Sequence, residues 1–208
     1  MANKAGNEAF EKLQNGNDQY RQSDVSYDPK AATALREKLT GGQSPHTAVL
    51  TCADSRVPAE RIFAGDLGEL FVVRVAGNIA DTMELASLEY AVAALKVPQI
   101  LVLGHTACGA VAATVDYVAS GNSPGSDSLL GLVKKIKPAV ETVQAANKDS
   151  SRDDTIAAAI QENVRQVANN LKESSPIIGK AVADDKLTIR GAVYNLGTGE
   201  VRYLDGLR

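Results

Sequence analysis

The feature that most constrains the fold is a series of short apolar runs separated by longer helical patterns. Three runs of strand length end at Cys52, Gly77 and His105. Amphipathic segments stand between and after them, for example residues 81–97 ("DTMELASLEYAVAALKV"). Short strands that alternate with helices predict βαβ units and a parallel sheet covered on both faces. We therefore expect an α/β fold with a mostly parallel central β-sheet flanked by helices.

The remaining segments predict further helices and a terminal hairpin. Periodic apolar positions indicate helices at about residues 7–22, 31–39, 106–120, 129–146 and 153–174. Pro138 should kink or divide the fourth of these helices. The tail, "LTIRGAVYNLGTGEVRYL", predicts two strands joined by a Gly-Thr-Gly turn, which is a C-terminal β-hairpin.

Side-chain patterns also predict helix caps and one buried helix face. Asp81 or Thr82 should cap the helix within residues 81–97, and Asp154 or Thr155 should cap the helix at 153–174. The helix within 81–97 should bury a broad apolar face made of Met83, Leu85, Leu88, Val92 and Leu95.

The length of 208 residues suits one domain. We expect a single α/β zinc-enzyme domain (1–208) with three parts. These parts are an N-terminal helical arm (1–40), a metal-site core (41–120) and a helical region with the C-terminal strands (121–208).

Composition and charge argue against several classes of partner. Lys and Arg number 22 against 25 Asp and Glu, a net charge of −3 that disfavours nucleic acid. Trp is absent, and no apolar run approaches the ~20 residues of a membrane-spanning helix. The N-terminal segment lacks the apolar core of a secretory signal. We therefore expect a cytoplasmic protein with no nucleic-acid or membrane partner, whose two cysteines serve as thiols or ligands.

Three of the four Cys and His residues fall at or just after predicted strand ends. His105 and Cys108 are spaced i, i+3, which on a helical turn puts both side chains on one face. Cys52 ends a neighbouring run, and ligands bind beyond the carboxyl ends of parallel strands. Two thiolates and one imidazole favour zinc, and three protein ligands leave the fourth position open, as in catalytic sites. Core packing of the cysteines is the alternative, and His46 is expected to be a surface histidine.

An acid and an arginine follow the first cysteine. If the chain stays extended, Cys52, Asp54 and Arg56 point to one side. Arg56 could then hold Asp54 ionised through two parallel hydrogen bonds, so that Asp54 accepts a hydrogen bond from metal-bound water. The alternative is a surface salt bridge of little energetic value.

The segments "CADSR" (52–56) and "HTAC" (105–108) resemble the paired motifs of the β-class carbonic anhydrases. The resemblance is close over roughly residues 42–113 and looser elsewhere. It implies a lyase that hydrates CO2 reversibly to bicarbonate and a proton by attack of zinc-bound hydroxide. It also implies one Zn²⁺ per chain, held by Cys52, His105 and Cys108, with Asp54 and Arg56 as the catalytic dyad beside it.

Further positions resemble the plant-type branch of that family. Gln43, Phe71 and Tyr90 match residues that line its substrate pocket at a dimer interface, although the two aromatic rings could equally be core residues. Gly109, which we also assign to the pocket, could let backbone approach closely or could be a turn glycine. The absence of Trp argues against the bicarbonate pocket of the other branch. The resemblance implies a homodimer or higher homo-oligomer, with the helix at 7–22 lying over the partner.

Two other functions stay open at this stage. One is hydrolysis of CS2 or COS on the same zinc scaffold. The other is a non-catalytic zinc or redox-sensing α/β protein. A further alternative concerns Asp54, which would reach the metal and fill the open position if Arg56 released it.

Overall fold

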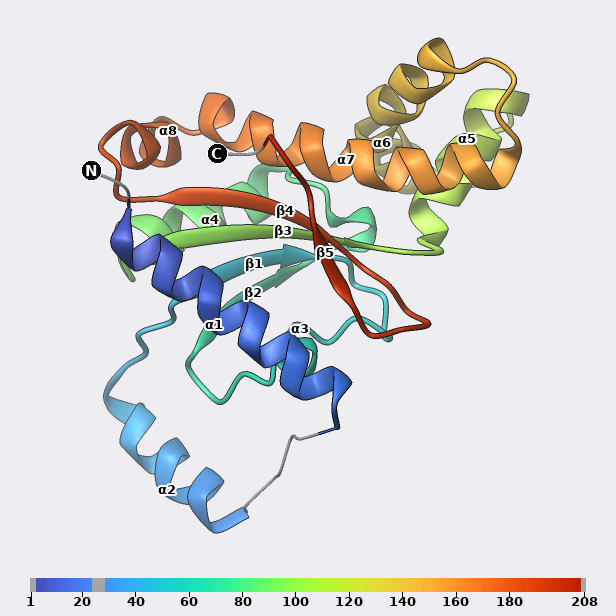
Figure 1. Ribbon diagram of the computed structural model, residues 1–208. Helices are drawn as coiled ribbons and strands as arrows, with labels where there is room; N and C mark the ends of the chain where they lie inside the picture. Colours follow the sequence, from blue (N-terminus) through green and yellow to red (C-terminus); the bar gives the residue numbers. More distant parts are fainter. Residues whose placement is uncertain (1–2, 24–28, 207–208) are drawn as a thin grey trace.

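The computed structural model describes residues 3–23 and 29–206 (Figure 1). Its helices are α1 (Lys4–Arg21), α2 (Pro29–Lys38), α3 (Ala59–Ile62), α4 (Thr82–Ala93), α5 (Gly109–Ser120), α6 (Asp127–Ala146), α7 (Arg152–Ser174) and α8 (Pro176–Ala183). Its strands are β1 (Thr47–Thr51), β2 (Leu70–Arg74), β3 (Gln99–His105), β4 (Thr188–Tyr194) and β5 (Val201–Tyr203). The short 3-10 turns η1 and η2 cover Leu39–Gly41 and Ala76–Asn78. The loop interpretation of "SDVSYDP" falls largely on residues 24–28, outside the described residues.

The strands form one sheet in the order β2-β1-β3-β4-β5. The first four are parallel, and β5 pairs antiparallel with β4. The predicted α/β fold, the mostly parallel sheet and the C-terminal hairpin are confirmed. Every residue of β1 and β3 is buried, as expected for inner strands of a sheet covered on both faces.

Two apolar cores cover the two faces of the sheet. The larger core joins residues of β1 and β3 to the helices α4 to α8. The smaller core joins other residues of the same strands to α1 and α3. Figure 1 shows α7 lying along one face of the sheet and α1 crossing the other. Both inner strands are thereby fixed, and so are the positions of their carboxyl ends.

Several local predictions need correction. Pro138 lies inside α6 and does not divide it, because the helix runs from Asp127 to Ala146, while a kink at Pro138 stays a prediction. The cap of α7 is Ser151, whose hydroxyl accepts a hydrogen bond from the Asp154 amide, and is neither Asp154 nor Thr155. Helix α8, which begins at Pro176 after the Ser175 cap, has no counterpart among the predicted helices. The predicted Asp81 cap of α4 is confirmed.

The N-terminal helix α1 contacts its own chain, and the expectation that it lies over a partner stays a prediction. Helix α1 packs on its own chain, where Leu13 is buried and Asn17 donates hydrogen bonds to the carbonyls of Ile62 and Gly199. Helix α2 stands away from the sheet in Figure 1. The proposed division of the domain into three parts stays a prediction.

Helix α4 has an apolar face that points outward. Leu88 and Val92 are buried as predicted, but Met83 is 72% exposed and does not belong to the core face. Tyr90 follows Met83 by seven residues, on the same side of the helix, and is 53% exposed. Helix α4 therefore has apolar surface on both sides. Within the described residues, no helix combines the length and the apolar character needed to cross a membrane.

Candidate metal centre

The carboxyl ends of three neighbouring strands meet at one edge of the sheet. The register pairs Thr51, the last residue of β1, with Arg74 of β2 and with Leu103 of β3. Cys52 therefore emerges between the end of β2 and the end of β3, where His105 lies. This is the edge at which parallel sheets bind ligands.

Cys52, His105 and Cys108 meet there, as predicted. One candidate ligand atom from each lies within 4.8 Å of the other two, and all three residues are buried. The geometry differs from the expected helical turn. His105 is the last residue of β3, and Cys108 precedes α5 as its N-cap. Between them Ala107 has a φ of 55°, so a tight turn, not a helix face, brings the two side chains together.

The imidazole of His105 is oriented for metal binding. Its Nδ1 lies 2.9 Å from the carbonyl oxygen of Thr106 and donates to it, because that oxygen can only accept. The other nitrogen, Nε2, is therefore unprotonated in the neutral ring. Nε2 is buried and has no hydrogen-bond partner among the described residues. A buried acceptor that faces two thiols is the arrangement expected of a metal ligand.

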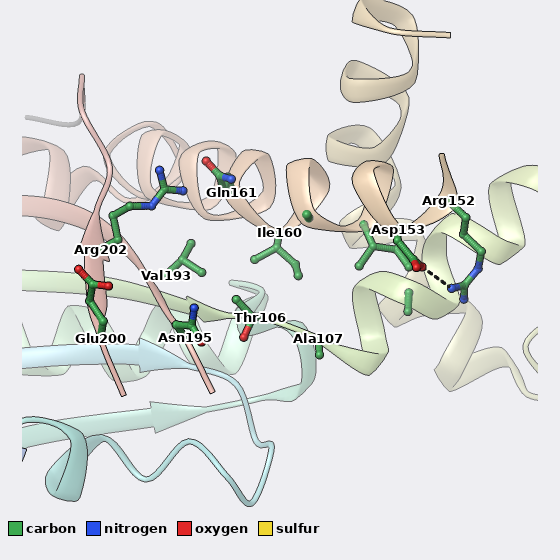
Figure 2. A pocket seen from close by; sticks show the side chains of 13 residues that line it. Thr106, Ala107, Arg152, Asp153, Ile160, Gln161, Val193, Asn195, Glu200 and Arg202 are labelled. Carbon is green, nitrogen blue, oxygen red and sulfur yellow. Dashed lines mark ion pairs between the residues drawn. The ribbon is translucent and has the colours of Figure 1, made fainter. Parts of the chain in front are cut away.

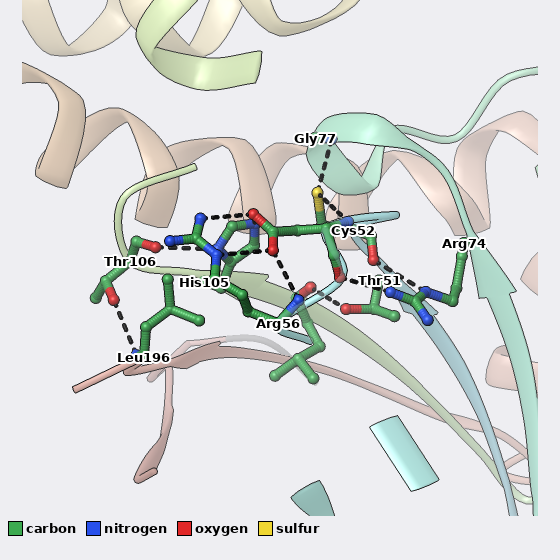
Figure 3. Close-up of polar contacts among 10 residues, drawn as sticks. Thr51, Cys52, Arg56, Arg74, Gly77, His105, Thr106 and Leu196 are labelled. Atoms are coloured by element: carbon green, nitrogen blue, oxygen red, sulfur yellow. Dashed lines mark hydrogen bonds and ion pairs between the residues drawn. The ribbon is translucent and has the colours of Figure 1, made fainter. Parts of the chain in front are cut away.

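Backbone amides support the sulfur of Cys52. Its Sγ accepts hydrogen bonds from the amides of Asp54 at 3.4 Å and Gly77 at 3.3 Å (Figure 3). The hydrogen bond from the Cys108 thiol, together with these amides, lowers the pKa of Cys52 below that of an ordinary thiol, against the opposing effect of burial. The same hydrogen bond and burial raise the pKa of Cys108. The site therefore favours one thiolate even without a metal.

Asp54 and Arg56 form a closed pair beside the cluster. Arg56 donates from Nε to Oδ1 at 2.9 Å and from Nη2 to Oδ2 at 2.7 Å, and its amide also donates to Oδ1. These bonds hold the pKa of Asp54 well below its usual range, despite some opposing desolvation. Oδ2 of Asp54 lies 3.8 Å from Nε2 of His105. The alternative in which Arg56 releases Asp54 is not the arrangement seen here.

The backbone around the pair is a turn and not the extended chain that was predicted. The amide of Val57 donates to the carbonyl of Asp54, which closes the turn. Arg74, at the end of β2, donates to the carbonyls of Cys52 at 3.2 Å and Asp54 at 2.6 Å (Figure 3). Arg74 was not among the predicted site residues. A charged residue at the end of an apolar run was the available signal.

Comparisons with known proteins agree with this geometry. The family model described as "Carbonic anhydrase" matches residues 47–201. A carbonic anhydrase of Mycolicibacterium smegmatis is 36% identical over 93% of this chain and 90% of its own length. The β-carbonic anhydrase CafA of Aspergillus fumigatus superposes with a TM-score of 0.77 at 27% identity, covering 86% of this chain and 84% of its own. The chain belongs to the carbonic anhydrase family.

A third relative also bears on assembly. One of two tetrameric β-carbonic anhydrases from Sordaria macrospora superposes with a TM-score of 0.71 at 26% identity, covering 95% of this chain and 98% of its own. The β-class membership expected from the two motifs is thus confirmed. The assignment to the plant-type branch stays a prediction.

The residues assigned to a carbonic anhydrase substrate pocket lie away from the metal cluster of the same chain. Phe71 pairs with Ala48, which precedes Cys52 by four residues, or about 13 Å of extended strand. The ring of Tyr90 lies 6.1 Å from that of Phe71. Gln43 is exposed in the loop before β1, at the opposite end of that strand from Cys52. One chain therefore does not bring these three residues to its own metal site.

Gly77 and Gly109 differ in how closely other atoms of the chain approach them. Gly77 has a φ of 69°, and an added Cβ would lie 2.6 Å from Cδ1 of Ile136, so the turn requires glycine. Gly109 begins α5, and an added Cβ there meets nothing within 4 Å. Close packing within the chain therefore does not explain why residue 109 is a glycine. The assignment of Gly109 to the pocket stays a prediction.

A cavity of about 590 Å³ lies between α5, α7 and the C-terminal hairpin (Figure 2). It includes Thr106 and Ala107 from the turn between His105 and Cys108. Neither the three candidate ligands nor Asp54 and Arg56 line it. The cavity is therefore separate from the cluster.

Proposed function

We propose that this member of the carbonic anhydrase family catalyses the reversible hydration of CO2 to bicarbonate and a proton, with one zinc ion per chain. The observation that carries the proposal is the buried Cys52, His105 and Cys108 cluster with Asp54 held beside it. Two thiols and an imidazole nitrogen without a partner fit zinc. When bound, zinc would act as a Lewis acid that lowers the pKa of the attacking water.

The chain's own residues would orient the reactants. Oδ2 of Asp54 would accept the hydrogen bond of the attacking water and direct its lone pair to the carbon of CO2. Arg56 would keep Asp54 ionised and fixed, since both carboxylate oxygens accept bonds from its guanidinium. The proton released on hydration would leave for solvent or buffer.

We further propose that the working unit is a homodimer or a larger homo-oligomer. Gln43, Phe71 and Tyr90 lie away from the cluster of their own chain, so they could line a substrate pocket only beside a second copy. The outward apolar side of α4, with Met83 and Tyr90, offers a surface for such contact. The tetrameric relative is consistent with this proposal. A cytoplasmic location stays a prediction.

Stopped-flow CO2 hydration at pH 8.4, followed with a pH indicator, tests the function. Zinc-loaded protein should hydrate CO2 rapidly, whereas Cys52→Ser should lose both zinc and activity. Ser55→Ala, an exposed change in the same loop, is the matched control and should keep both. Full zinc loading without hydration would contradict the proposal. Turnover of CS2 or COS under those conditions would then favour the alternative hydrolase.

A further inference from the structure

A buried asparagine connects helix α7 to the candidate metal centre. Asn163 is 2% exposed and lies on the buried side of α7, near Ile160 and Val164. Its Nδ2 donates a hydrogen bond of 2.9 Å to the carbonyl oxygen of Gly77. A polar amide buried among apolar side chains costs free energy unless it is paired. The contact with Gly77 supplies that pairing across 86 residues of sequence.

Gly77 is the residue whose amide donates to the sulfur of Cys52. Its left-handed conformation and its contact with Ile136 require glycine, as described above. Glycine has little conformational preference of its own, so neighbouring groups must fix the direction of its amide. The carbonyl of the same residue is the group that Asn163 holds.

The turn itself does not supply this support. Asn78, the next residue, is buried at a φ of 45°, and its Nδ2 has no hydrogen-bond partner among the described residues. The Asn78 amide donates to the carbonyl of Val75, which closes the turn but leaves the Gly77 carbonyl to α7. The orientation of Gly77 therefore depends on a helix that contributes none of the three candidate ligands.

We propose that Asn163 is a positioning residue for the metal ligand Cys52. It holds the carbonyl of Gly77, in the peptide plane that follows the Gly77 Cα, and so restrains the turn whose preceding peptide plane carries the amide that donates to Sγ of Cys52. An amide bond to a ligating sulfur orients the ligand and tunes the metal, as supporting contacts around metal sites generally do. The inference rests on the proposed metal site, and it gives α7 a role in that site.

The test compares Asn163→Leu with a control in the same helix. Leu keeps the branching at Cγ but removes the donor, so zinc should bind about 10–100-fold more weakly in competition with a chromogenic chelator. Ala168→Gly, more than one turn further along α7, weakens the helix without removing the donor. Its zinc affinity should stay within about twofold of wild type. Cobalt-substituted samples give a second measurement, because the thiolate-to-metal absorption band should shift only in Asn163→Leu.

Each outcome decides the inference. A selective loss of affinity and a selective band shift in Asn163→Leu would support it. Equal effects in both variants, or no effect in either, would overturn it. If Asn163→Leu does not fold, Asn163→Ser, whose donor is shorter, should still weaken zinc binding, and wild-type affinity there would overturn the inference. Wild-type protein that binds no zinc would overturn the proposed function, and this inference with it.

Discussion

The two ends of the parallel sheet differ in how firmly their own chain holds the side chains that lie there. At the carboxyl end of β1, Cys52 and Asp54 are each held by several hydrogen bonds from their own chain. At the amino end lie the exposed Gln43 and the half-exposed ring of Tyr90. Hydrogen bonds within one chain hold the side chains at the carboxyl end, whereas the side chains named at the amino end are exposed.

This difference separates two requirements of the proposed reaction. Metal binding needs fixed ligands, and the strand ends supply them because both inner strands are buried. A pocket for apolar CO2 needs enclosure, which the exposed side of α4 and β2 could gain against a second copy. Variants that each change only one of these regions separate the two requirements.

The largest effect should follow loss of the Asp54 charge. Asp54→Asn should lower kcat/KM for CO2 hydration by about 10²–10³-fold, the range for loss of one preorganised hydrogen-bonding group at the reacting atoms. Arg56→Lys should have a smaller effect, because Lys cannot form two parallel bonds to a carboxylate. Zinc content, measured by elemental analysis, should not change in either variant.

Arg61→Lys, an exposed change on α3, serves as the control and should retain full activity. If Asp54→Asn hydrates CO2 at the wild-type rate, Asp54 is not part of the reaction.

The pH dependence should come from the attacking water and not from Asp54. Arg56 holds the pKa of Asp54 below its usual range, so this carboxylate stays ionised throughout pH 6–9. Two thiolate ligands carry more negative charge than three imidazoles, which should keep the pKa of the water above about 7. Initial rates from stopped-flow should therefore rise with pH above neutrality and level off as the pH passes the pKa of the water.

Arg56→Lys should show the same rise at a lower rate, since Asp54 remains ionised there as well. A profile that is flat from pH 6.5 to 9 would contradict this account of the ligand set.

The smallest effect concerns the amino end of the sheet. Gln43→Ala should remove one hydrogen bond to substrate, worth about 1 kcal/mol, and lower kcat/KM about fivefold. Ser44→Ala, the exposed neighbour, should have no effect. Equal activity of the two variants would mean that this end of the sheet does not take part in the reaction.

Sequence patterns predicted the elements that depend on local periodicity. Buried strands such as β3 and the helix cap at Asp81 have signals within a few residues. The meeting of Cys52 with His105 also followed, because parallel strands place their carboxyl ends together.

Several features that sequence patterns did not predict depend on how segments pack in the folded chain. Met83 matches a core pattern but lies on the outer side of α4. The turn at Ala107 and the contact of Asn163 with Gly77 depend on tertiary packing across many residues. A pattern in one segment does not indicate which distant group will lie against it.

One chain should complete the metal centre, whereas the substrate pocket should need a second copy. Met83→Arg places a charge on the outward face of α4 and should separate the copies, as sedimentation would show. Zinc affinity and CO2 hydration are then measured together on the separated chain. The account predicts one tightly bound zinc per chain with most of the hydration activity lost. A separated chain that hydrates CO2 at the full rate, or one that loses its zinc, would contradict it.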